Sequence, residues 1–418
     1  MKEFVISEAK VEIAVLVGLI TQTQDERKTN EYLDELAFLA ETAGAEVVKR
    51  FTQKLPTAHS VTYVGKGKID EIRTLLNALD ATGIICDDEL SPVQMNHLQQ
   101  ELESKIMDRT LLILDIFASR AVTKEGKIQV ELAQLRYRAV RLVGLGSSLS
   151  RLGGGIGTRG PGEKKLEMDR RLIKERISQL KKELEHVKKH RELLREGRKK
   201  DRVMTAAIVG YTNAGKSTLL NTLTDAGVLS EDKLFATLDP TTRLLELDGG
   251  QRIYLTDTVG FIRKLPHHLI EAFKSTLEEA KYADVILHVV DASNPQVEEQ
   301  MFIVYETLRE LGVKDKTIVT LFNKQDRLAG NEILRDFKAD YVLKISARTG
   351  LGLDELKNTL EKILIGNQIY IERVLDYKDA GMLQLVRKYG QLIEEKYTEN
   401  GIEIKARVPK DIYGRLGE

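Results

Sequence analysis

A glycine-rich octapeptide near the middle of the chain has residue types and spacing suited to holding phosphate groups. The apolar run Met204–Val209 leads into Gly210-Tyr211-Thr212-Asn213-Ala214-Gly215-Lys216-Ser217, and the helix-forming residues Thr218–Leu220 follow. Strand, glycine-rich loop and helix in this order make a P-loop, in which backbone N–H groups and the helix N-terminus converge on phosphates. We expect Lys216 to reach the β- and γ-phosphates of a nucleotide and Ser217 to bind Mg²⁺. A chance glycine-rich turn is the alternative, and the flanking strand and helix disfavour it.

A second motif supplies a carboxylate and a backbone N–H that could serve a phosphate-bound magnesium ion. Asp257-Thr258-Val259-Gly260 follows the apolar run Ile253–Leu255 and lies 40 residues after Ser217. The second sheet strand of a Ras-like domain would end at that interval, so we expect Asp257 beside Mg²⁺ and the Gly260 N–H near the γ-phosphate. Taken alone, the tetrapeptide is only a turn after a strand, and its position gives it weight.

Two further motifs could recognise a guanine base. Asn323-Lys324-Gln325-Asp326 ends the apolar run Thr317–Phe322, and Ser346-Ala347-Arg348 follows Tyr341–Ile345. The Asp326 carboxylate can accept from guanine N1–H and the 2-amino group, which adenine lacks, and such mispairing costs on the order of 10⁴-fold in selectivity. Backbone N–H groups of the second motif could contact guanine O6. An ATP-specific enzyme explains the first two motifs and leaves Asn323 and Asp326 without a role, so the four together predict a GTPase.

A threonine-rich segment between the P-loop and Asp257 could sense the γ-phosphate. Its sequence is Phe235-Ala236-Thr237-Leu238-Asp239-Pro240-Thr241-Thr242-Arg243, in the interval where a Ras-like domain keeps its first switch. A switch threonine binds Mg²⁺ and responds to the γ-phosphate, and we select Thr237 for this role, with Phe235–Asp239 at the nucleotide. Thr241 and Thr242 are the competitors, and a loop threonine without such a role is a third reading.

Two positions affect how fast such a site hydrolyses its nucleotide. Phe261 follows Gly260, where Ras-type enzymes carry the glutamine that orients the attacking water, and a phenyl ring cannot do this. We therefore expect slow intrinsic hydrolysis, with a partner, a cation or bound water replacing the missing group. Asn213 stands where some GTPases hold K⁺ against the phosphates, although an asparagine selected for turn geometry explains it equally well. The residues expected to act in hydrolysis are Lys216, Thr237, Gly260 and Asn213.

The chain before the P-loop begins with short apolar runs that alternate with helical patterns. The strand-like runs are Ile13–Ile20, Ile84–Cys86 and Leu111–Ile116, and the helix-like stretches include Asn30–Thr42 and Ser91–Leu102. This alternation predicts a small α/β domain with a mainly parallel sheet over residues 1–122. Cys86 is the single cysteine, which excludes an internal disulfide, and a buried, inert thiol is favoured over a reactive one.

Residues 123–202 are predicted to form a helix, a glycine-rich loop and a basic helical linker. Lys124–Leu145 has a helical apolar stripe, and the segment 151–162 has six glycines and one proline, which predicts a loop. Apolar residues then recur in a coiled-coil-like seam that Arg191 interrupts, at Ile173, Ile177, Leu180, Leu184 and Val187. Sixteen Lys or Arg residues stand against eight Asp or Glu residues between positions 164 and 202. With Arg151 and Arg159 in the loop, this cationic rod suits an RNA surface, but a flexible linker and a solvated helix are the plainer reading.

The predicted fold class is α/β, with a Ras-like P-loop GTPase domain over residues 203–365. A small C-terminal α+β domain over residues 366–418 completes the chain, after the N-terminal α/β domain and the helical, coiled-coil-like linker. It is predicted from strand-like Gln368–Leu375, helix-like Ala380–Lys388 and an Asn400-Gly401 turn before the alternating run Ile402–Val408.

The overall composition and net charge say little about binding partners. Lys plus Arg equals Asp plus Glu at 64 each, so net charge favours neither a polyanionic nor a polycationic partner. No apolar run approaches the ~18 residues of a membrane helix, and the start Met1–Phe4 carries an acid where a signal peptide has basic and apolar residues. We expect a soluble, cytoplasmic monomer without a membrane span.

The sequence resembles the HflX family of translational GTPases over nearly its whole length. The residues that carry the resemblance are Gly157-Thr158-Arg159-Gly160-Pro161-Gly162-Glu163, the run Phe235–Thr241, Asp257-Thr258-Val259-Gly260-Phe261 and the other nucleotide motifs. The resemblance implies binding to the large ribosomal subunit and its rRNA, and the separation of stalled or idle ribosomes into subunits under stress. It also implies Ser217 and Thr237 as the Mg²⁺ ligands and a hydrophobic residue as normal at position 261.

Two classes of function remain open. The chain could be an enzyme whose GTP hydrolysis drives or resets ribosome splitting, or a GTP-dependent ribosome-binding switch or assembly factor in which hydrolysis only permits release. Phe261 favours the second mildly. A third class, an ATP-dependent RNA remodeller that uses the N-terminal domain, has no motif support. Val64-Gly65-Lys66-Gly67-Lys68 is too short for a P-loop, and we expect it to form a basic turn.

Overall fold

The computed structural model describes residues 11–149, 161–201, 203–224, 234–247, 251–265, 278–328, 334–366, 368–409 and 413–414. The chain divides into two compact units. The N-terminal unit comprises Met1–Val187, Glu231–Asp239 and Arg263–Ser275, and the nucleotide unit comprises Lys188–Ser230, Pro240–Ile262 and Thr276–Glu418. Two short segments from the second half of the chain therefore belong to the N-terminal unit. No described helix is long and apolar enough to cross a membrane.

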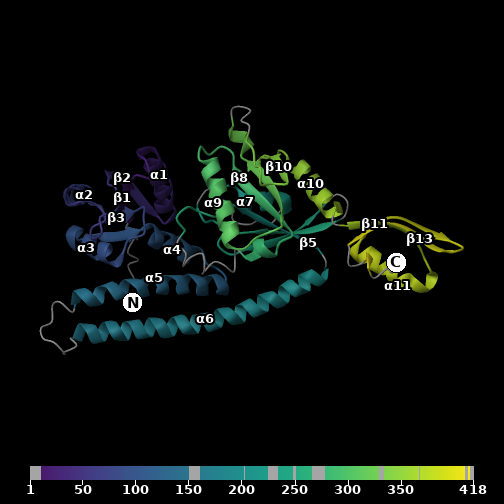
Figure 1. The fold of residues 1–418 in the computed structure, drawn as a ribbon, viewed down its shortest axis with the longest axis horizontal. Helices are drawn as coiled ribbons and strands as arrows, with labels where there is room; N and C mark the ends of the chain where they lie inside the picture. Colours follow the sequence, from purple (N-terminus) through teal and green to yellow (C-terminus); the bar gives the residue numbers. More distant parts are fainter. Residues whose placement is uncertain are drawn as a thin grey trace, which may run out of the picture. The chain divides into compact units, whose positions relative to one another are not determined.

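The N-terminal unit is built on a parallel sheet in the order β2-β1-β3-β4 (Figure 1). Its strands are β1 (Glu12–Ile20), β2 (Ala45–Lys54), β3 (Gly83–Cys86) and β4 (Lys105–Asp108), and its first helices are α1 (Glu26–Thr42), α2 (Lys66–Ala78), α3 (Pro92–Leu102) and α4 (Arg109–Arg120). Val15 and Val17 of β1 pack with apolar residues of α2 and α3 in one core. The predicted α/β class with a parallel sheet is confirmed, and Cys86 is buried as expected.

The predicted strand at Leu111–Ile116 is wrong, because these residues form the middle of helix α4. Asp108 begins this helix, since its side chain accepts a hydrogen bond from the Leu111 N–H at 2.8 Å. Most of the helix is buried, including Leu112 and Ile113. A helix that is apolar on nearly every side lacks the periodic pattern that separates it from a buried strand.

The predicted basic turn at Val64–Lys68 is also wrong in its second half. Gly65 precedes helix α2, and Lys66 opens the first turn of that helix. Gln53 of β2 holds the helix start, because its side-chain oxygen accepts from the Gly65 N–H at 2.8 Å. The two lysines in this first turn therefore belong to a helix that is anchored by its apolar face at Ile69 and Ile72.

Two long helices follow the α/β part, α5 (Lys124–Leu149) and α6 (Pro161–Asp201). The predicted seam packs against α5: Leu180 is fully buried with Ile128 and Leu132, and partly buried neighbours complete the contact, namely Leu135, Ile177, Leu184 and Val187. The predicted glycine-rich loop, with Arg151 and Arg159, lies outside the described residues apart from its last two residues. Pro161 and Gly162 are helical, which corrects the loop prediction there, because proline fits the first turn of a helix.

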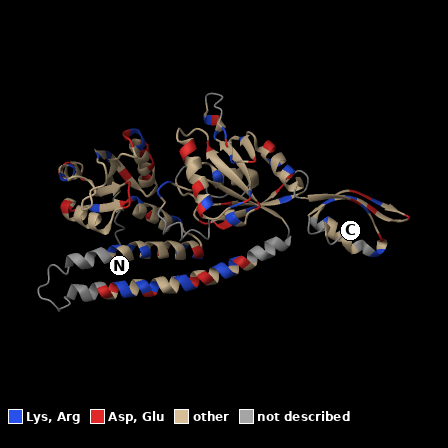
Figure 2. Ribbon diagram, viewed as in Figure 1, with Lys and Arg blue, Asp and Glu red and all other residues tan. Residues whose placement is uncertain are grey.

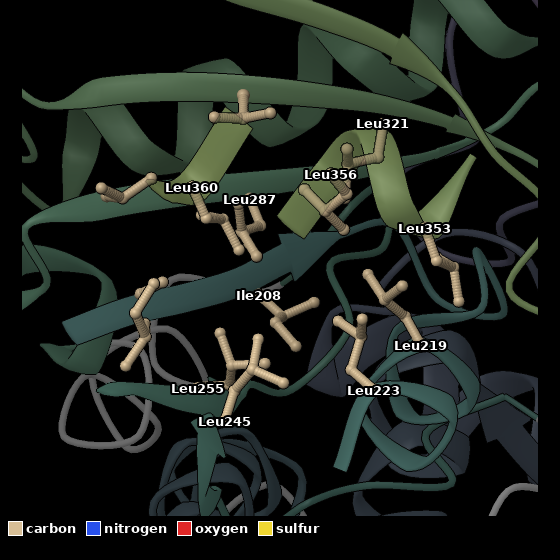
Figure 3. Close-up of a cluster of buried hydrophobic side chains, with 14 of the residues drawn as sticks. Ile208, Leu219, Leu223, Leu245, Leu255, Leu287, Leu321, Leu353, Leu356 and Leu360 are labelled. Atoms are coloured by element: carbon tan, nitrogen blue, oxygen red, sulfur yellow. The ribbon is translucent and has the colours of Figure 1, made fainter. Parts of the chain in front are cut away.

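The nucleotide unit contains a six-stranded sheet in the order β10-β9-β8-β5-β7-β6, in which only β6 runs antiparallel to its neighbour. Its strands are β5 (Met204–Gly210), β6 (Thr241–Glu246), β7 (Arg252–Asp257), β8 (Val285–Asp291), β9 (Thr317–Asn323) and β10 (Tyr341–Lys344), and its helices include α7 (Lys216–Thr224), α9 (Val297–Glu310) and α10 (Leu353–Gly366). Leu219 of α7 and Leu356 of α10 meet Ile208 and Leu287 of the central strands in one apolar core (Figure 3). This core fixes the carboxyl ends of the central strands, where the nucleotide motifs lie.

A small antiparallel sheet and one helix complete the nucleotide unit. The strands β11 (Gln368–Leu375), β13 (Gly401–Pro409) and β12 (Gln391–Thr398) lie in that order, and α11 (Ala380–Tyr389) packs on one face through Val386. The predicted Asn400-Gly401 hairpin is confirmed. Gly401 has φ +137°, and a Cβ there would lie 2.5 Å from the Leu375 carbonyl oxygen, so only glycine fits this corner.

Candidate nucleotide-binding site

The P-loop joins strand β5 to helix α7 and depends on two glycines. Gly210 has φ +155°, and a Cβ on it would lie 2.2 Å from the Val289 carbonyl oxygen. Gly215 has φ +96°, and its Cβ would lie 2.3 Å from the Asn323 amide nitrogen. Asn213 also takes a left-handed φ of +60°, which asparagine tolerates better than most residues. The loop backbone is therefore closely packed and shaped as a phosphate-binding loop requires.

Lys216 is the buried cation of the loop. Its side chain is only 6% exposed, and Nζ donates to the Tyr211 carbonyl oxygen at 2.8 Å. Burial lowers the pKa of Lys216 to about 8, and the charge of Lys324 lowers it further while Asp257 acts in the opposite direction. A bound triphosphate would reverse the balance, since its negative charge favours the protonated lysine.

Ser217 and Asp257 form the part of the site that suits a magnesium ion. The Ser217 hydroxyl donates to Asp257 Oδ2 at 2.7 Å, and Asp257 is fully buried at the end of β7. The described residues hold no group of three His, Cys, Asp or Glu side chains that could bind a metal alone. Magnesium in nucleotide sites uses one or two protein oxygens together with phosphates and water, so this hydroxyl–carboxylate pair fits it.

The segment Gly260–Phe261 lies directly on the P-loop. The Phe261 N–H donates to the Gly210 carbonyl at 3.1 Å, and the Thr212 N–H donates to the Phe261 carbonyl at 2.8 Å. A Cβ on Gly260 would lie 3.0 Å from Lys216 Nζ and 2.8 Å from the Thr212 Cα. The Phe261 ring is 1% exposed, so it offers no polar group to a water. Gly260 therefore lies beside Lys216, and its predicted contact with a γ-phosphate stays a prediction.

Asn323 acts as a cross-link between two of the predicted motifs. Its amide nitrogen donates to the Ala214 carbonyl at 2.8 Å, and its oxygen accepts from the Ala347 N–H at 2.8 Å. The side chain is 2% exposed. Asn323 therefore holds the P-loop and the Ser346–Arg348 loop together, a structural role that the motif alone did not reveal.

Asp326 remains exposed beside Asn323, as a base-recognising carboxylate should. The buried Ser346 hydroxyl donates to Asp326 Oδ1 at 2.6 Å, and this hydrogen bond lowers the pKa of the Asp326 carboxyl below its usual value. Gln325 lies between Asn323 and Asp326 in the sequence, and its N–H donates to the Ile345 carbonyl at 3.2 Å. The two motifs predicted to recognise guanine thus meet at one place, and the exposed Asp326 carboxylate lies there.

Sequence reasoning missed Asp291 at the end of β8. The Asp291 carboxylate pairs with Lys324 Nζ at 2.7 Å, and both side chains are largely buried. Lys324 itself has φ +64°, so the pair fixes a strained residue within the Asn323–Asp326 motif. A polar residue that ends a buried strand was the available signal, because the carboxyl ends of parallel strands share one edge of the sheet.

The predicted switch residues Phe235–Asp239 belong to the N-terminal unit, whereas the other predicted site residues belong to the nucleotide unit. Phe235 has φ +53°, and its ring meets Phe117 edge-on with centroids 4.6 Å apart. Asp239 Oδ2 accepts from the N–H groups of Val122 and Thr123 at 3.0 and 2.9 Å. The segment that contains Thr237 is therefore anchored at the start of α5.

Three family models match the chain and together span most of it. The model described as "GTP-binding GTPase N-terminal" matches residues 30–118, and "GTP-binding GTPase Middle Region" matches residues 120–198. The model described as "50S ribosome-binding GTPase" matches residues 205–324, which contain the P-loop, Asp257 and Asn323.

Curated relatives match over nearly full length. A protein named GTPase HflX from Lacrimispora saccharolytica is 64% identical, with 97% of this chain and 96% of the relative covered. A GTPase HflX from Caldanaerobacter subterraneus subsp. tengcongensis is 50% identical, with 97% and 93% covered. Among solved structures, a GTP-binding protein from the archaeon Sulfolobus solfataricus in complex with GDP is 27% identical, has a TM-score of 0.45, and covers 84% of this chain and 98% of its own.

Proposed function

We propose that this chain, which belongs to the HflX family of GTPases, binds the large ribosomal subunit and separates stalled or idle ribosomes into subunits under stress. Its activity is the binding of GTP and its hydrolysis to GDP and phosphate. The observation that carries the ribosomal part is the match of residues 205–324 to the model described as "50S ribosome-binding GTPase". We place the protein in the cytoplasm, as a monomer that meets its ribosomes there.

The geometry of the nucleotide unit supports the following mode of GTP binding. P-loop N–H groups and Lys216 hold the phosphates, and Asp326 accepts from the guanine edge. Ser217 would hold Mg²⁺, with Asp257 behind it and Thr237 as a second protein ligand. The metal, when bound, neutralises charge that develops on the β- and γ-phosphate oxygens. These residues contribute position and charge, which is most of what phosphoryl transfer needs.

Hydrolysis needs a water aligned with the γ-phosphate, and the described site has one weakness in this respect. The Gly260 N–H can hold a γ-phosphate oxygen, but the next side chain, Phe261, is buried and apolar. We therefore propose that intrinsic hydrolysis is slow and that the large subunit, or K⁺ held by Asn213, supplies the missing alignment or charge.

The cationic part of α6 supports an RNA partner. Lys and Arg residues recur along the described part of this helix (Figure 2), and exposed examples are Arg171, Lys174, Lys181 and Lys182. The apolar seam on its other side is occupied by α5 through Leu180. A helix with one side occupied and cations on the exposed side can release counterions from phosphates.

The decisive experiment is the GTPase rate of purified protein alone, with small subunits and with large subunits. We expect strong stimulation by the large subunit alone, on the order of 10³-fold or more if the ribosome completes the catalytic site as activating proteins do. An unchanged rate with the large subunit would remove the proposed partner while leaving the GTPase activity itself intact.

The second candidate function is a binding switch or assembly factor in which hydrolysis only permits release. The buried Phe261 favours it, because a phenyl ring cannot activate water. Single-round splitting of ribosomes with a non-hydrolysable GTP analogue separates the two. A switch splits once with the analogue, whereas an enzyme that uses the energy of hydrolysis does not split at all.

Charge reversal tests whether α6 contacts RNA. We expect Lys181→Glu/Lys182→Glu to weaken cosedimentation with large subunits and to flatten its dependence on salt. The control is Lys314→Glu, which reverses an exposed cation of the nucleotide unit. Equal cosedimentation of the double variant and wild type at raised salt would make α6 a tether rather than an RNA-binding element.

A further inference from the structure

The residues that follow Phe261 bind a buried carboxylate of the N-terminal unit. Arg263 donates from Nη2 to Asp87 Oδ1 at 3.0 Å, and Lys264 Nζ donates to Asp87 Oδ2 at 2.8 Å. Asp87 lies immediately after β3 and is 1% exposed, and Arg263 is 5% exposed. Burial alone would raise the pKa of Asp87, but the charges of Arg263, Arg109 and Lys264 outweigh it and hold this pKa below its usual value.

Further groups surround the Arg263 guanidinium on several sides. Glu35 of α1 lies 3.1 Å from Nε, and the Tyr32 carbonyl accepts from Nη2 at 2.8 Å. The centroid of the Tyr32 ring lies 3.6 Å from the guanidinium carbon of Arg263, in the stacked position that arginine prefers. Arginine presents donors in a fixed fork, so this combination of carboxylates, carbonyl and ring selects a guanidinium rather than any cation.

We name Glu35, Asp87 and Asp88 the carboxylate cluster. Arg109, Arg263 and Lys264 form ion pairs with it. Withdrawal of Arg263 and Lys264 would remove two of these cations from the three carboxylates. Asp87 is 1% exposed and Glu35 is 14% exposed, so their charges favour the return of the cations.

The carboxylate cluster lies where sheets of this type hold ligands. In the order β2-β1-β3-β4 the chain leaves β1 toward β2 on one side and later returns to β3 on the other, so the topology switches between β1 and β3. Ligands of doubly wound sheets bind at the carboxyl ends of strands at such a point. Tyr63, which is buried at φ +66°, donates to Asp88 there at 2.7 Å. A strained, bulky residue that orients a carboxylate indicates a built receptor rather than a chance ion pair.

The chain from Gly260 to Lys264 links the P-loop to the carboxylate cluster. Gly260 and Phe261 are hydrogen-bonded to or packed on the P-loop, and Arg263 follows two residues later. Gly260 and Arg263 are three positions apart, which spans about 11 Å at most, so a shift of Gly260 toward a γ-phosphate can pull on Arg263. Asp239, two residues after Thr237, is likewise held by Val122 and Thr123 of the N-terminal unit.

We infer that the carboxylate cluster binds the Arg263–Lys264 pair in competition with the contact between Gly260 and the γ-phosphate, so that the N-terminal unit sets the preference for GTP over GDP. In the GDP form the cationic pair occupies the cluster. In the GTP form Gly260 moves to the γ-phosphate and weakens that hold. The inference needs only nucleotide binding and does not depend on the ribosome.

The test measures the affinities for GDP and for a non-hydrolysable GTP analogue by fluorescence titration, without ribosomes. Asp87→Asn and Lys264→Gln should each raise the affinity for the analogue relative to GDP, by about tenfold, within the range of allosteric couplings. Lys264 is about one-third exposed, so its substitution is compatible with folding even where Asp87→Asn is not. The matched control is Glu101→Gln, which removes the exposed ion pair with Arg73 in the same unit and should leave the ratio unchanged.

The combined variant supplies a second measurement. Because Asp87 and Lys264 act through one contact, Asp87→Asn/Lys264→Gln should raise the ratio no further than the stronger single change. Folded Lys264→Gln protein with a wild-type affinity ratio would overturn the inference. So would a ratio that rises equally in the Glu101→Gln control.

Discussion

Asn323 and Asp326 belong to one tetrapeptide but have different tasks. Asn323 is buried and bonded to Ala214 and Ala347, so its loss would disturb the P-loop and the Ser346–Arg348 loop together. Asp326 is exposed, and its Oδ1 accepts a hydrogen bond from the Ser346 hydroxyl. Base selectivity should therefore be separable from the integrity of the loops, and Asp326 is the residue at which to separate them.

We predict that Asp326→Asn changes base preference without loss of folding. The amide can donate one hydrogen bond where the carboxylate accepted two, so GTP affinity should fall by on the order of 10²-fold or more, and xanthosine triphosphate should bind better than GTP. Calorimetric titration with both nucleotides measures the change. Ser346→Ala is the companion variant, and it should weaken GTP binding only modestly because the carboxylate remains. GTP binding by Asp326→Asn at wild-type strength would contradict the assignment.

We also predict that Asn213 links turnover to K⁺. Its left-handed φ of +60° meets the turn requirement, and glycine would meet it too. If the side-chain oxygen holds K⁺ at the phosphates, wild-type turnover is faster in K⁺ than in Na⁺ at equal ionic strength, and Asn213→Gly abolishes the difference. Equal wild-type rates in the two salts would leave turn geometry as the sole role of Asn213.

At the same scale, His288 makes stability depend on pH. This histidine of β8 is 1% exposed, and burial lowers its pKa to about 4, while the charge of Asp336 acts in the opposite direction. The unfolded histidine titrates near 6.5, so the unfolded chain binds more protons between these values and stability falls as pH falls from 6.5 to 4. We predict that the unfolding free energy of the His288→Gln protein falls by roughly 3 kcal/mol less than that of the wild type between pH 6.5 and pH 4. Urea unfolding at pH 7 and pH 4.5 measures this difference in stability. The control is His97→Gln, which changes an exposed histidine. Equal losses of stability in the wild type and the His288→Gln protein would refute the prediction.

At the scale of elements, the seam of α6 shows what periodicity can establish. The alternating steps of four and three foretold a packed stripe, and α5 fills it. We predict that Leu180→Ala, which empties a fully buried position, costs about 2–5 kcal/mol of unfolding free energy. Leu172→Ala on the same helix removes a side chain that is 56% exposed and should change stability by less than about 0.5 kcal/mol. Equal effects in urea titration would mean that the seam does not hold the helices together.

Other elements show where local patterns stop being sufficient. The strands that end at Asp257 and Asn323 follow from apolar runs punctuated by functional residues, and the structure contains both. Leu111–Ile116 has an equally apolar run but forms a helix, because Asp108 caps it and the surrounding core covers most sides. Periodicity cannot distinguish the two cases when nearly every position is buried.

At the scale of the whole molecule, contacts between distant parts of the sequence could not be foreseen. Asp239 meets Thr123 across 116 positions, and Lys264 meets Asp87 across 177. Neither contact has a local spacing that would reveal it, since a lysine after a glycine-rich motif is common on any solvated surface. The sequence therefore predicted nucleotide ligands but gave no sign that Asp239 and Lys264 bond to residues of the N-terminal unit.

These anchors lead to a prediction about amides that are remote from any nucleotide ligand. The Val122 and Thr123 N–H groups donate to Asp239, and they should exchange hydrogen faster with a GTP analogue than with GDP once Thr237 moves toward Mg²⁺ and pulls Asp239 away. Hydrogen–deuterium exchange read by mass spectrometry on a peptide covering these residues measures it. The Gly390 N–H, which donates to Val386 at the end of α11, serves as the internal control and should not respond. Responses confined to residues 204–365 would mean that the N-terminal unit does not sense the nucleotide, because an anchored segment cannot move without exposing the amides that hold it.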